Sequence, residues 1–227
     1  MSTYILNIET ATTNCSVSVS KDGETIVLKE DYDKNYSHAE RLHVYIVDVL
    51  KEANISLDDI EAVAVSKGPG SYTGLRIGVS AAKGLCFAID KPLISISTLE
   101  ALAHQVTCNE GVIIPMLDAR RMEVYAAVFD AGYNQIRATE AQILDEHAFE
   151  DYLEAGNVYF IGNGVEKAKT LIKHPNAIFI DDKLPSANEM GHLAYNKYKI
   201  SDTEDVAYFG PYYLKDFVAL KPKAKSL

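Results

Sequence analysis

Lys67-Gly-Pro-Gly-Ser-Tyr-Thr-Gly-Leu-Arg-Ile-Gly-Val-Ser-Ala-Ala-Lys-Gly-Leu85 is a glycine-rich turn that runs directly into a segment of small residues. The apolar run Ala62–Val65 precedes it and is typical of a buried strand, so the turn joins a strand to a helix. Its three early glycines permit backbone angles that a side chain would forbid, and its proline fixes φ. We therefore expect a tight, preformed turn at the end of a strand.

The start of the helix that follows is a candidate phosphate site, because backbone N–H groups and the helix dipole converge there. Gly68, Gly70 and Gly74 give the spacing G-x-G-x-x-x-G. That spacing matches neither the dinucleotide-binding fingerprint nor the P-loop, and no Gly-Lys-Ser/Thr follows. Ser71 and Thr73 are better interpreted as turn and cap residues.

The helix itself is rich in residues that an isolated helix would not favour. Gly74, Gly78 and Ala82 recur every four residues and lower its intrinsic stability. Small residues at that spacing let a neighbouring helix approach almost to backbone contact. The apolar line beside them consists of Leu75, Val79, Cys86 and Ile89. The pattern is equally compatible with a neighbour from the same chain and with a second protein.

Composition limits the classes of function. The 227 residues include 22 basic and 32 acidic ones, and the net charge of −10 disfavours extensive nucleic-acid binding by this chain alone. The three cysteines, Cys15, Cys86 and Cys108, are widely spaced and form no C-x-x-C, which argues against disulfides and a zinc site. Without a signal peptide or a membrane-length apolar run, a cytoplasmic location is expected.

The first half of the chain has the element order βββαβαβα. Its expected strands are Tyr4–Ile8, Cys15–Val19, Glu24–Leu28, Ala62–Val65 and Lys91–Ile96. One helix is expected from Ser37 to Ala53, beginning with a capping box of Ser37 and Glu40. The second is the glycine-turn helix, and Ser97 with Glu100 starts the third.

The second half repeats this order. Its expected strands begin with Val112–Leu117 and Glu123–Val128, and its last helix is capped by Ser186 and Glu189. Such a repeat predicts an α/β fold with two βββαβαβα lobes and mixed sheets. We expect the lobes to cover residues 1–108 and 109–227, with the end of the chain packing back on the first lobe.

A duplicated βββαβαβ unit resembles the actin, hexokinase and Hsp70 ATPase architecture, also called the ASKHA or RNase H-like fold. With Gly68-Pro-Gly-Ser-Tyr-Thr-Gly-Leu-Arg-Ile-Gly78 in the first lobe, the chain resembles the TsaB (YeaZ) family. The supporting motifs are Ile8-Glu-Thr-Ala-Thr12, Ser37-His-Ala-Glu-Arg-Leu42, Asp118-Ala-Arg-Arg-Met-Glu-Val-Tyr125, Gly162-Asn-Gly164 and Pro211-Tyr-Tyr-Leu-Lys215. In the last motif Lys215 replaces the family's usual arginine.

The resemblance implies a bacterial subunit needed to make threonylcarbamoyladenosine beside the anticodon of certain tRNAs. The larger paralogue TsaD would carry the metal and transfer the threonylcarbamoyl group. The small subunit would bind and support it without catalysis, with the ATPase TsaE in a larger complex and tRNA contacted indirectly. The implied alternative to the TsaD heterodimer is a homodimer when the chain is alone.

The expected partner surface combines the helix from Ser37 to Ala53 with the helix from Gly74 to Ile89. Its expected members are Ser37, His38, Arg41, Leu42, Tyr45, Ile46, Val49, Gly70, Tyr72, Thr73, Gly74, Leu75, Arg76, Gly78, Val79, Ala82 and Cys86. Arg76 is a cation in the first turn of a helix, a position that favours an anionic partner. We expect Gly78→Arg to block association with TsaD and to leave the fold intact.

A vestigial nucleotide site is expected from Glu9, Thr10, Thr12, Asp118 and Arg120. ATPases of this architecture place an aspartate and a glycine-bearing turn after the first strand, where they hold metal and phosphate. Here neither Glu9-Thr-Ala-Thr12 nor Asp118-Ala-Arg-Arg121 contains glycine, so no tightly bound cofactor is expected. ATP or ADP with Mg²⁺ would bind at the partner interface instead. An ATP-dependent kinase or hydrolase is the alternative function.

A metallopeptidase is the least favoured alternative. TsaD-like proteins use a His-x-x-x-His pair whose imidazoles face one ion. His38 and His43 are five residues apart, which places them about 140° apart around a helix. The other histidines, His104, His147, His174 and His192, show no ligand spacing. We therefore expect no metal site and no catalytic residue.

Overall fold

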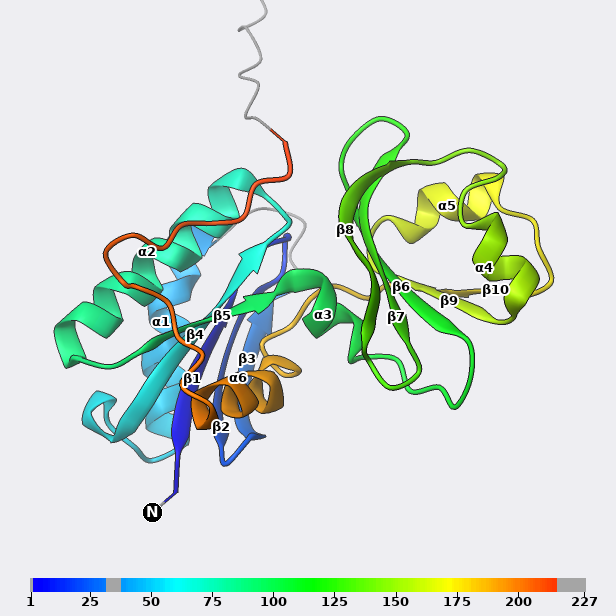
Figure 1. Cartoon of the computed structure of the whole chain (residues 1–227). Coiled ribbons are helices and arrows are strands. Elements are labelled where there is room, and N and C mark those ends of the chain that lie inside the picture. The colour runs from blue at the N-terminus through cyan, green and yellow to red at the C-terminus, as the bar shows by residue number, and fades with distance from the viewer. Residues whose placement is uncertain (1, 32–37, 216–227) are drawn as a thin grey trace, which may run out of the picture.

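Two five-stranded mixed sheets make up the computed structural model, which describes residues 2–31 and 38–215 (Figure 1). The first has the order β3 (Glu24–Asp31), β2 (Cys15–Lys21), β1 (Tyr4–Glu9), β4 (Ile60–Gly68) and β5 (Leu93–Ser97). The second has the order β10 (Ala177–Ile180), β9 (Val158–Ile161), β6 (Val112–Asp118), β7 (Glu123–Asp130) and β8 (Gln135–Ile143). Each sheet places its first strand at the centre, antiparallel to the second and parallel to the fourth. The predicted duplicated α/β fold is confirmed.

Helices connect the strands in the predicted order. The first half contains α1 (His38–Glu52), the short 3-10 helix η1 (Leu57–Asp59), α2 (Tyr72–Ile89) and α3 (Thr98–Ala103). The second half contains α4 (Glu150–Ala155), α5 (Val165–Leu171) and α6 (Met190–Lys199). In the part of the chain that the structure describes, none of these helices is long and apolar enough to cross a membrane.

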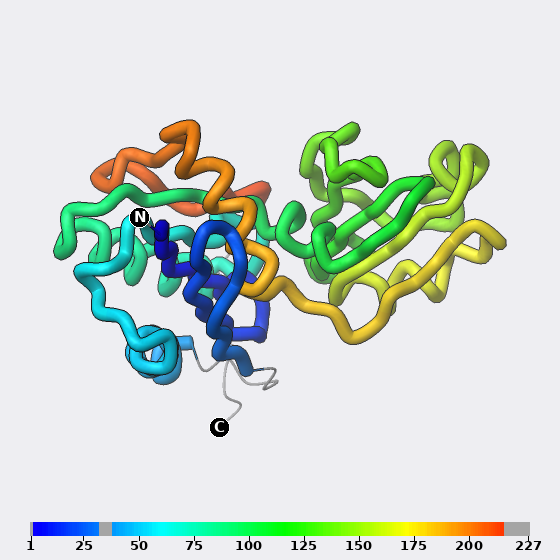
Figure 2. The backbone as a smooth tube through the Cα atoms, turned by 90° about the horizontal axis from the view of Figure 1, so that it is seen from below, coloured from blue at the N-terminus to red at the C-terminus, as the bar shows by residue number. Residues whose placement is uncertain are grey.

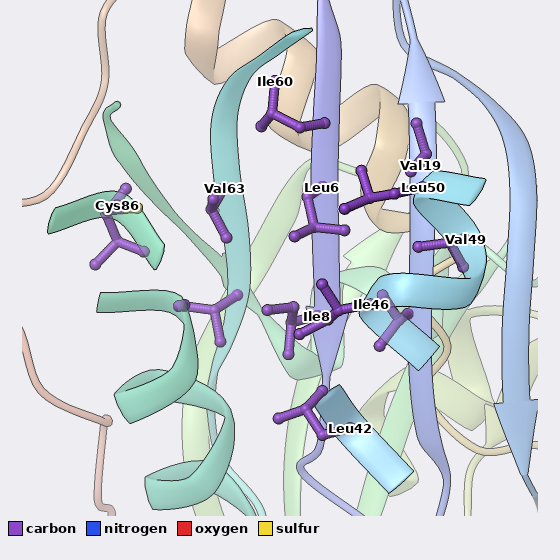
Figure 3. Packing of buried hydrophobic residues seen from close by; sticks show 14 of the residues in the cluster. Leu6, Ile8, Val19, Leu42, Ile46, Val49, Leu50, Ile60, Val63 and Cys86 are labelled. Carbon is purple, nitrogen blue, oxygen red and sulfur yellow. The ribbon is translucent and has the colours of Figure 1, made fainter. Parts of the chain in front are cut away.

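Helices α1 and α2 cover one face of the first sheet with an apolar core. Figure 3 shows Leu42 and Ile46 of α1 packed over Leu6 and Ile8 of β1, with Cys86 of α2 on the other side. Burial of such side chains is worth about 1.5 to 3 kcal/mol each relative to exposure. This core fixes α1 and α2 side by side on the sheet.

Helix α3 lies between the two sheets, with Ala101 on the first, and α6 packs on the sheet of the other half. Leu99 and Leu102 of α3 join the core under the second sheet with Ile113. Met190 and Ala194 of α6 instead cover the face of the first sheet opposite α1 and α2. Figures 1 and 2 show both crossing segments between the halves. Helix α6, which lies within the expected second lobe 109–227, is thus part of the chain end that packs back on the first lobe.

Two of the predicted helix starts are confirmed and one is wrong. Ser71 and Ser97 are N-caps whose side chains accept hydrogen bonds from the N–H groups of Gly74 and Glu100. Ser186 does not cap α6, because its hydroxyl donates to Glu30 at 2.7 Å and accepts from the Asn188 N–H. The capping box at Ser37 lies outside the described residues.

After α6 the chain returns along the outside of the first half. We call residues 204–215 the strap, drawn in orange to red in Figure 1. Its Glu204 N–H donates to Leu93 O of β5 at 2.8 Å, and Lys83 of α2 donates to Phe209 O at 2.8 Å. The Tyr212 N–H then donates to Lys67 O at 2.7 Å, beside the glycine turn. The strap thus follows β5, α2 and the glycine turn in succession.

Candidate partner surface and interlobe cleft

The turn after β1 lies against the start of α2. Ser71 N–H donates to Ala11 O at 2.6 Å, and the Thr10 hydroxyl donates to Gly74 O at 2.8 Å. A Cβ at Gly74 would lie 2.1 Å from Thr10 O, and one at Gly78 would lie 2.2 Å from Thr10 Oγ1. Gly74 and Gly78 of α2 are therefore required by a contact within the chain.

This contact overturns the expected role of the small-residue line. Gly74, Gly78 and Ala82 are buried in the monomer, where the first two meet Thr10. They cannot also be the surface that a second protein covers. The expectation that Gly78→Arg leaves the fold intact is wrong, because any side chain at this position collides with the turn after β1.

Most residues of the expected partner surface face inward. The buried ones are His38, Leu42, Ile46, Val49, Gly74, Leu75, Gly78, Val79, Ala82 and Cys86. Arg41, Tyr45, Gly70 and Tyr72 are half-buried. Thr73 and Arg76 are exposed, and Ser37 lies outside the described residues. The apolar lines found in the sequence are thus the sides that hold α1 and α2 on the sheet.

A second apolar face lies on the outside of the same helix pair. Val44 and Val47 of α1 are 54% and 63% exposed, and Phe87 of α2 is 86% exposed. A groove runs between the two helices and is lined by Ala39, His43, Arg76, Ile77, Ser80, Ala81, Gly84 and Leu85. Except for Arg76, the sequence analysis missed these residues. The sequence feature that could have indicated this outer face is the pair Val44 and Val47. The two valines are three residues apart and do not belong to the line of apolar residues that α1 turns toward the core.

Glu9 of β1 is completely buried on the opposite side of the sheet from α1 and α2. Its Oε1 accepts hydrogen bonds from Ala11 N–H at 2.6 Å and from the Ser66 hydroxyl at 2.9 Å. Burial raises the pKa of this carboxyl to about 7, and hydrogen bonds from the Ala11 N–H and Ser66 partly oppose the shift. Oε1 therefore joins β1 to β4, while the buried Oε2 has no hydrogen-bond partner among the described residues.

A cleft of ≈ 340 Å³ lies where the carboxyl ends of β1 and β6 meet the glycine turn. It brings together Thr12, Asp118 and Arg120 of the expected nucleotide site, while Glu9 and Thr10 do not line it. Asp118 forms an ion pair with Lys167 at 2.7 Å and accepts the Arg120 N–H at 2.6 Å. Its own N–H donates to Asn163 Oδ1 at 2.8 Å. The Asp118 carboxylate is therefore already held by the second half of the chain.

The strap forms one wall of this cleft, which the sequence analysis did not foresee. The Tyr213 ring packs against Tyr72 in a tilted arrangement with ring centroids 5.0 Å apart, and both line the cleft. At its end Lys215 forms an ion pair with Glu123 and lies 5.7 Å from the Tyr125 ring centroid. These contacts give a role to the lysine that replaces the family's usual arginine. They tie the strap to the second half.

Four of the histidines form two pairs, one whose members lie apart and one whose members are in contact. His38 is buried and its Nε2 lies 2.7 Å from Thr12 O, whereas His43 is exposed on the groove. His104 and His192, which show no ligand spacing in the sequence, contact each other with Nδ1 to Nε2 at 3.2 Å. Among residues 2–31 and 38–215, no three His, Cys, Asp or Glu side chains form a group able to hold a metal ion.

Known proteins are similar to this chain in sequence. The family model described as "TsaD: tRNA N6-adenosine threonylcarbamoyltransferase" matches residues 33–223. The tRNA threonylcarbamoyladenosine biosynthesis protein TsaB of Escherichia coli (strain K12) is 33% identical over 225 residues, 96% of each chain. The tRNA N6-adenosine threonylcarbamoyltransferase of Staphylococcus haemolyticus (strain JCSC1435) is 38% identical over 130 residues, 51% of this chain and 38% of that protein.

Similarity to a solved structure extends over almost the whole molecule. YeaZ from Pseudomonas aeruginosa superposes with a TM-score of 0.82 at 25% identity, covering 93% of this chain and 100% of that one. The sequence match to the Escherichia coli protein covers the turn after β1, the glycine turn and the strap together, since it spans 96% of the chain. The chain therefore belongs to the TsaB (YeaZ) proteins of tRNA threonylcarbamoyladenosine biosynthesis, within the family that the TsaD model describes.

Proposed function

We propose that this chain is a non-catalytic subunit that docks onto a tRNA N6-adenosine threonylcarbamoyltransferase, TsaD, through the outer face of α1 and α2. The observation that carries the proposal is the exposed apolar character of that face, with Val44, Val47 and Phe87 beside a groove. Exposed apolar side chains that gather next to a groove are typical of protein-binding surfaces. The docked chain orders the catalytic partner and performs no chemistry itself.

The arrangement of the carboxylates supports the non-catalytic part of this proposal. Glu9 is enclosed in the sheet and bonded to Ala11 and Ser66, so it is not available to a ligand in the cleft. Asp118 is paired with Lys167. Ser71 N–H and Gly74 N–H at the start of α2 are taken by Ala11 O and by the Ser71 side chain. These groups would otherwise hold metal and phosphate.

The partner's similarity to this chain supports a symmetric mode of docking. A TsaD protein is 38% identical to this chain over 130 residues, and its proposed docking face is a helix pair equivalent to α1 and α2. Two such pairs packed face to face would bury their apolar sides in a bundle. In the absence of TsaD, the same surface would form a homodimer. TsaE and tRNA would join through the complex, and ATP or ADP with Mg²⁺ would bind at the joint surface.

Size-exclusion chromatography with light scattering tests the proposal on the full chain, alone and with the TsaD protein of the same genome. We expect a 1:1 heterodimer with TsaD and a homodimer without it. An ATPase assay of the isolated chain runs in parallel and should show no turnover. Separate elution of the two proteins would count against docking. ATP hydrolysis by the isolated chain, if Asp118→Asn abolished it, would favour an ATP-dependent enzyme acting at the ≈ 340 Å³ cleft.

A further inference from the structure

Arg76 lines the groove and contacts a residue that lines the cleft. Its side chain lines the groove between α1 and α2. On the other side its Nε donates a hydrogen bond at 3.2 Å to the hydroxyl of Tyr213, which lines the cleft. A change in the hydrogen bonds of the Arg76 guanidinium therefore affects both the groove and the cleft.

The contacts that hold Arg76 are uncharged. Its guanidinium carbon lies 4.1 Å from the centroid of the Tyr72 ring, and its only hydrogen-bond partner among the described residues is the Tyr213 hydroxyl. Within residues 2–31 and 38–215 no carboxylate pairs with it. Arg76 is thus an exposed cation that an anion would stabilise.

The groove around Arg76 differs in charge from the rest of the molecule. The whole chain has a net charge of −10, yet none of the eight residues that line the groove is acidic. Arg76 is the one arginine or lysine among them, and His43 lies on the same wall. A partner surface that presents a carboxylate over Arg76 is therefore complementary to the groove.

We propose that a docked partner protein places an acidic side chain on Arg76 and that this contact takes Arg76 away from Tyr213. The inference rests on the proposed function, because it assigns the chemistry of the same docking surface. An arginine binds a carboxylate through charge-assisted, often bidentate hydrogen bonds, which are about twice as strong as a bond to a neutral phenol. A carboxylate that binds side-on uses the Nε–H and one Nη–H, so it takes the N–H that the Tyr213 hydroxyl accepts.

Docking would then loosen the strap at the mouth of the cleft. Without the hydrogen bond from Arg76, Tyr213 keeps its ring contact with Tyr72. The Tyr212 N–H to Lys67 O bond and the Lys215 to Glu123 ion pair remain on either side. The two events are coupled through a shared residue, so the coupling acts equally in both directions. A strap that lacks the hydrogen-bond acceptor for Arg76 should therefore raise the affinity of the chain for its docked partner.

Isothermal titration of TsaD into Tyr213→Phe tests this coupling. The variant keeps the ring that packs against Tyr72 and removes only the acceptor for Arg76. We expect its affinity for TsaD to rise about three- to tenfold, the equivalent of one net hydrogen bond. Tyr208→Phe is the matched control, because Tyr208 is 89% exposed on the same strap and its affinity should be unchanged.

Arg76→Ala completes a double-mutant cycle with Tyr213→Phe. Alone, Arg76→Ala should weaken docking at least tenfold, and in its background Tyr213→Phe should have no further effect. An unchanged affinity of Tyr213→Phe in a chain whose wild type binds TsaD would overturn the inference and leave the proposed function standing. Failure of the wild-type chain to bind would instead defeat the proposed function. Equal gains from Tyr213→Phe with and without Arg76 would also contradict the coupling.

Discussion

The Thr10 hydroxyl donates a hydrogen bond to the carbonyl oxygen of Gly74 at 2.8 Å, so the turn after β1 is fastened to the first turn of α2. Thr10 also occupies the space in which Cβ atoms at Gly74 and Gly78 would lie. Gly74 and Gly78 are thus explained by this close approach within the chain. The surface left for a partner is the opposite side of the helix pair.

Gly78→Ala should destabilise the protein. The added Cβ would lie 2.2 Å from Thr10 Oγ1 and must displace the turn after β1. We expect a loss of about 1 to 3 kcal/mol in the free energy of unfolding, as is usual for overpacked sites. Urea denaturation followed by circular dichroism measures it.

Gly84→Ala is the matched control for that substitution. Gly84 lies six residues further along α2, and a Cβ there meets nothing within 4 Å. Alanine is the better helix former, so this variant should gain about 0.5 to 1 kcal/mol. If Gly78→Ala were as stable as Gly84→Ala, the close packing of Thr10 on α2 would be refuted.

Glu9→Gln should remove a pH dependence of stability. The pKa of Glu9 is raised from 4.5 to about 7 in the folded protein, so the folded state binds a proton that the unfolded state releases. Its favourable contribution is complete below pH 4.5 and is lost as the pH rises to 7. Glu9→Gln should match the wild type at pH 4.5 and exceed it by about 3 kcal/mol at pH 8.

Urea denaturation at several pH values between 4.5 and 8 checks this expectation, with the difference from the wild type as the readout. Glu110→Gln, at an exposed loop position, is the control and should follow the wild type throughout. A Glu9→Gln variant that is less stable than the wild type at pH 8 would show that the buried side chain is needed as a carboxylate.

The sequence was sufficient for much of the fold because the relevant signals are local. The N-caps Ser71 and Ser97 depend only on residues within one helical turn, and both were predicted. The same holds for the alternation in Cys15–Val19, which became β2. The placement of α3 between the sheets and of α6 on the first sheet depends on contacts between residues far apart in the chain, for which no local pattern exists.

The side of α2 that faces a proposed partner could not be predicted from local sequence patterns either. Gly74 and Gly78 form the same small-residue pattern whether a second protein or Thr10 of the same chain lies against them. The sequence therefore could not tell the inner from the outer side of α2. Likewise, the contact between Arg76 and Tyr213 joins residues 137 positions apart, and only the folded strap brings them together.

His104→Gln should make the protein less sensitive to acid. Burial, helped by the neighbouring His192, lowers the pKa of His104 from 6.5 to about 4 in the folded protein. The stability that this group contributes is complete above pH 6.5 and is lost as the pH falls toward 4. The variant should therefore lose less stability than the wild type between pH 6.5 and 4, as measured by thermal unfolding.

His43→Gln serves as the comparison, because His43 is exposed on α1. Its loss of stability over the same pH range should equal that of the wild type. If His104→Gln and His43→Gln behaved alike, the contact between His104 and His192 would not be a source of acid sensitivity.

Titration calorimetry of TsaD with Val47→Glu and Ile143→Glu tests most directly whether the outer face of α1 and α2 binds the partner. The two side chains are 63% and 62% exposed, so neither charge disturbs the core, but Val47 lies on α1 and Ile143 on the edge strand β8. We predict that Val47→Glu weakens binding at least a hundredfold, a loss of about 3 kcal/mol or more, and that Ile143→Glu binds like the wild type. Undiminished binding of a folded Val47→Glu variant would contradict the account.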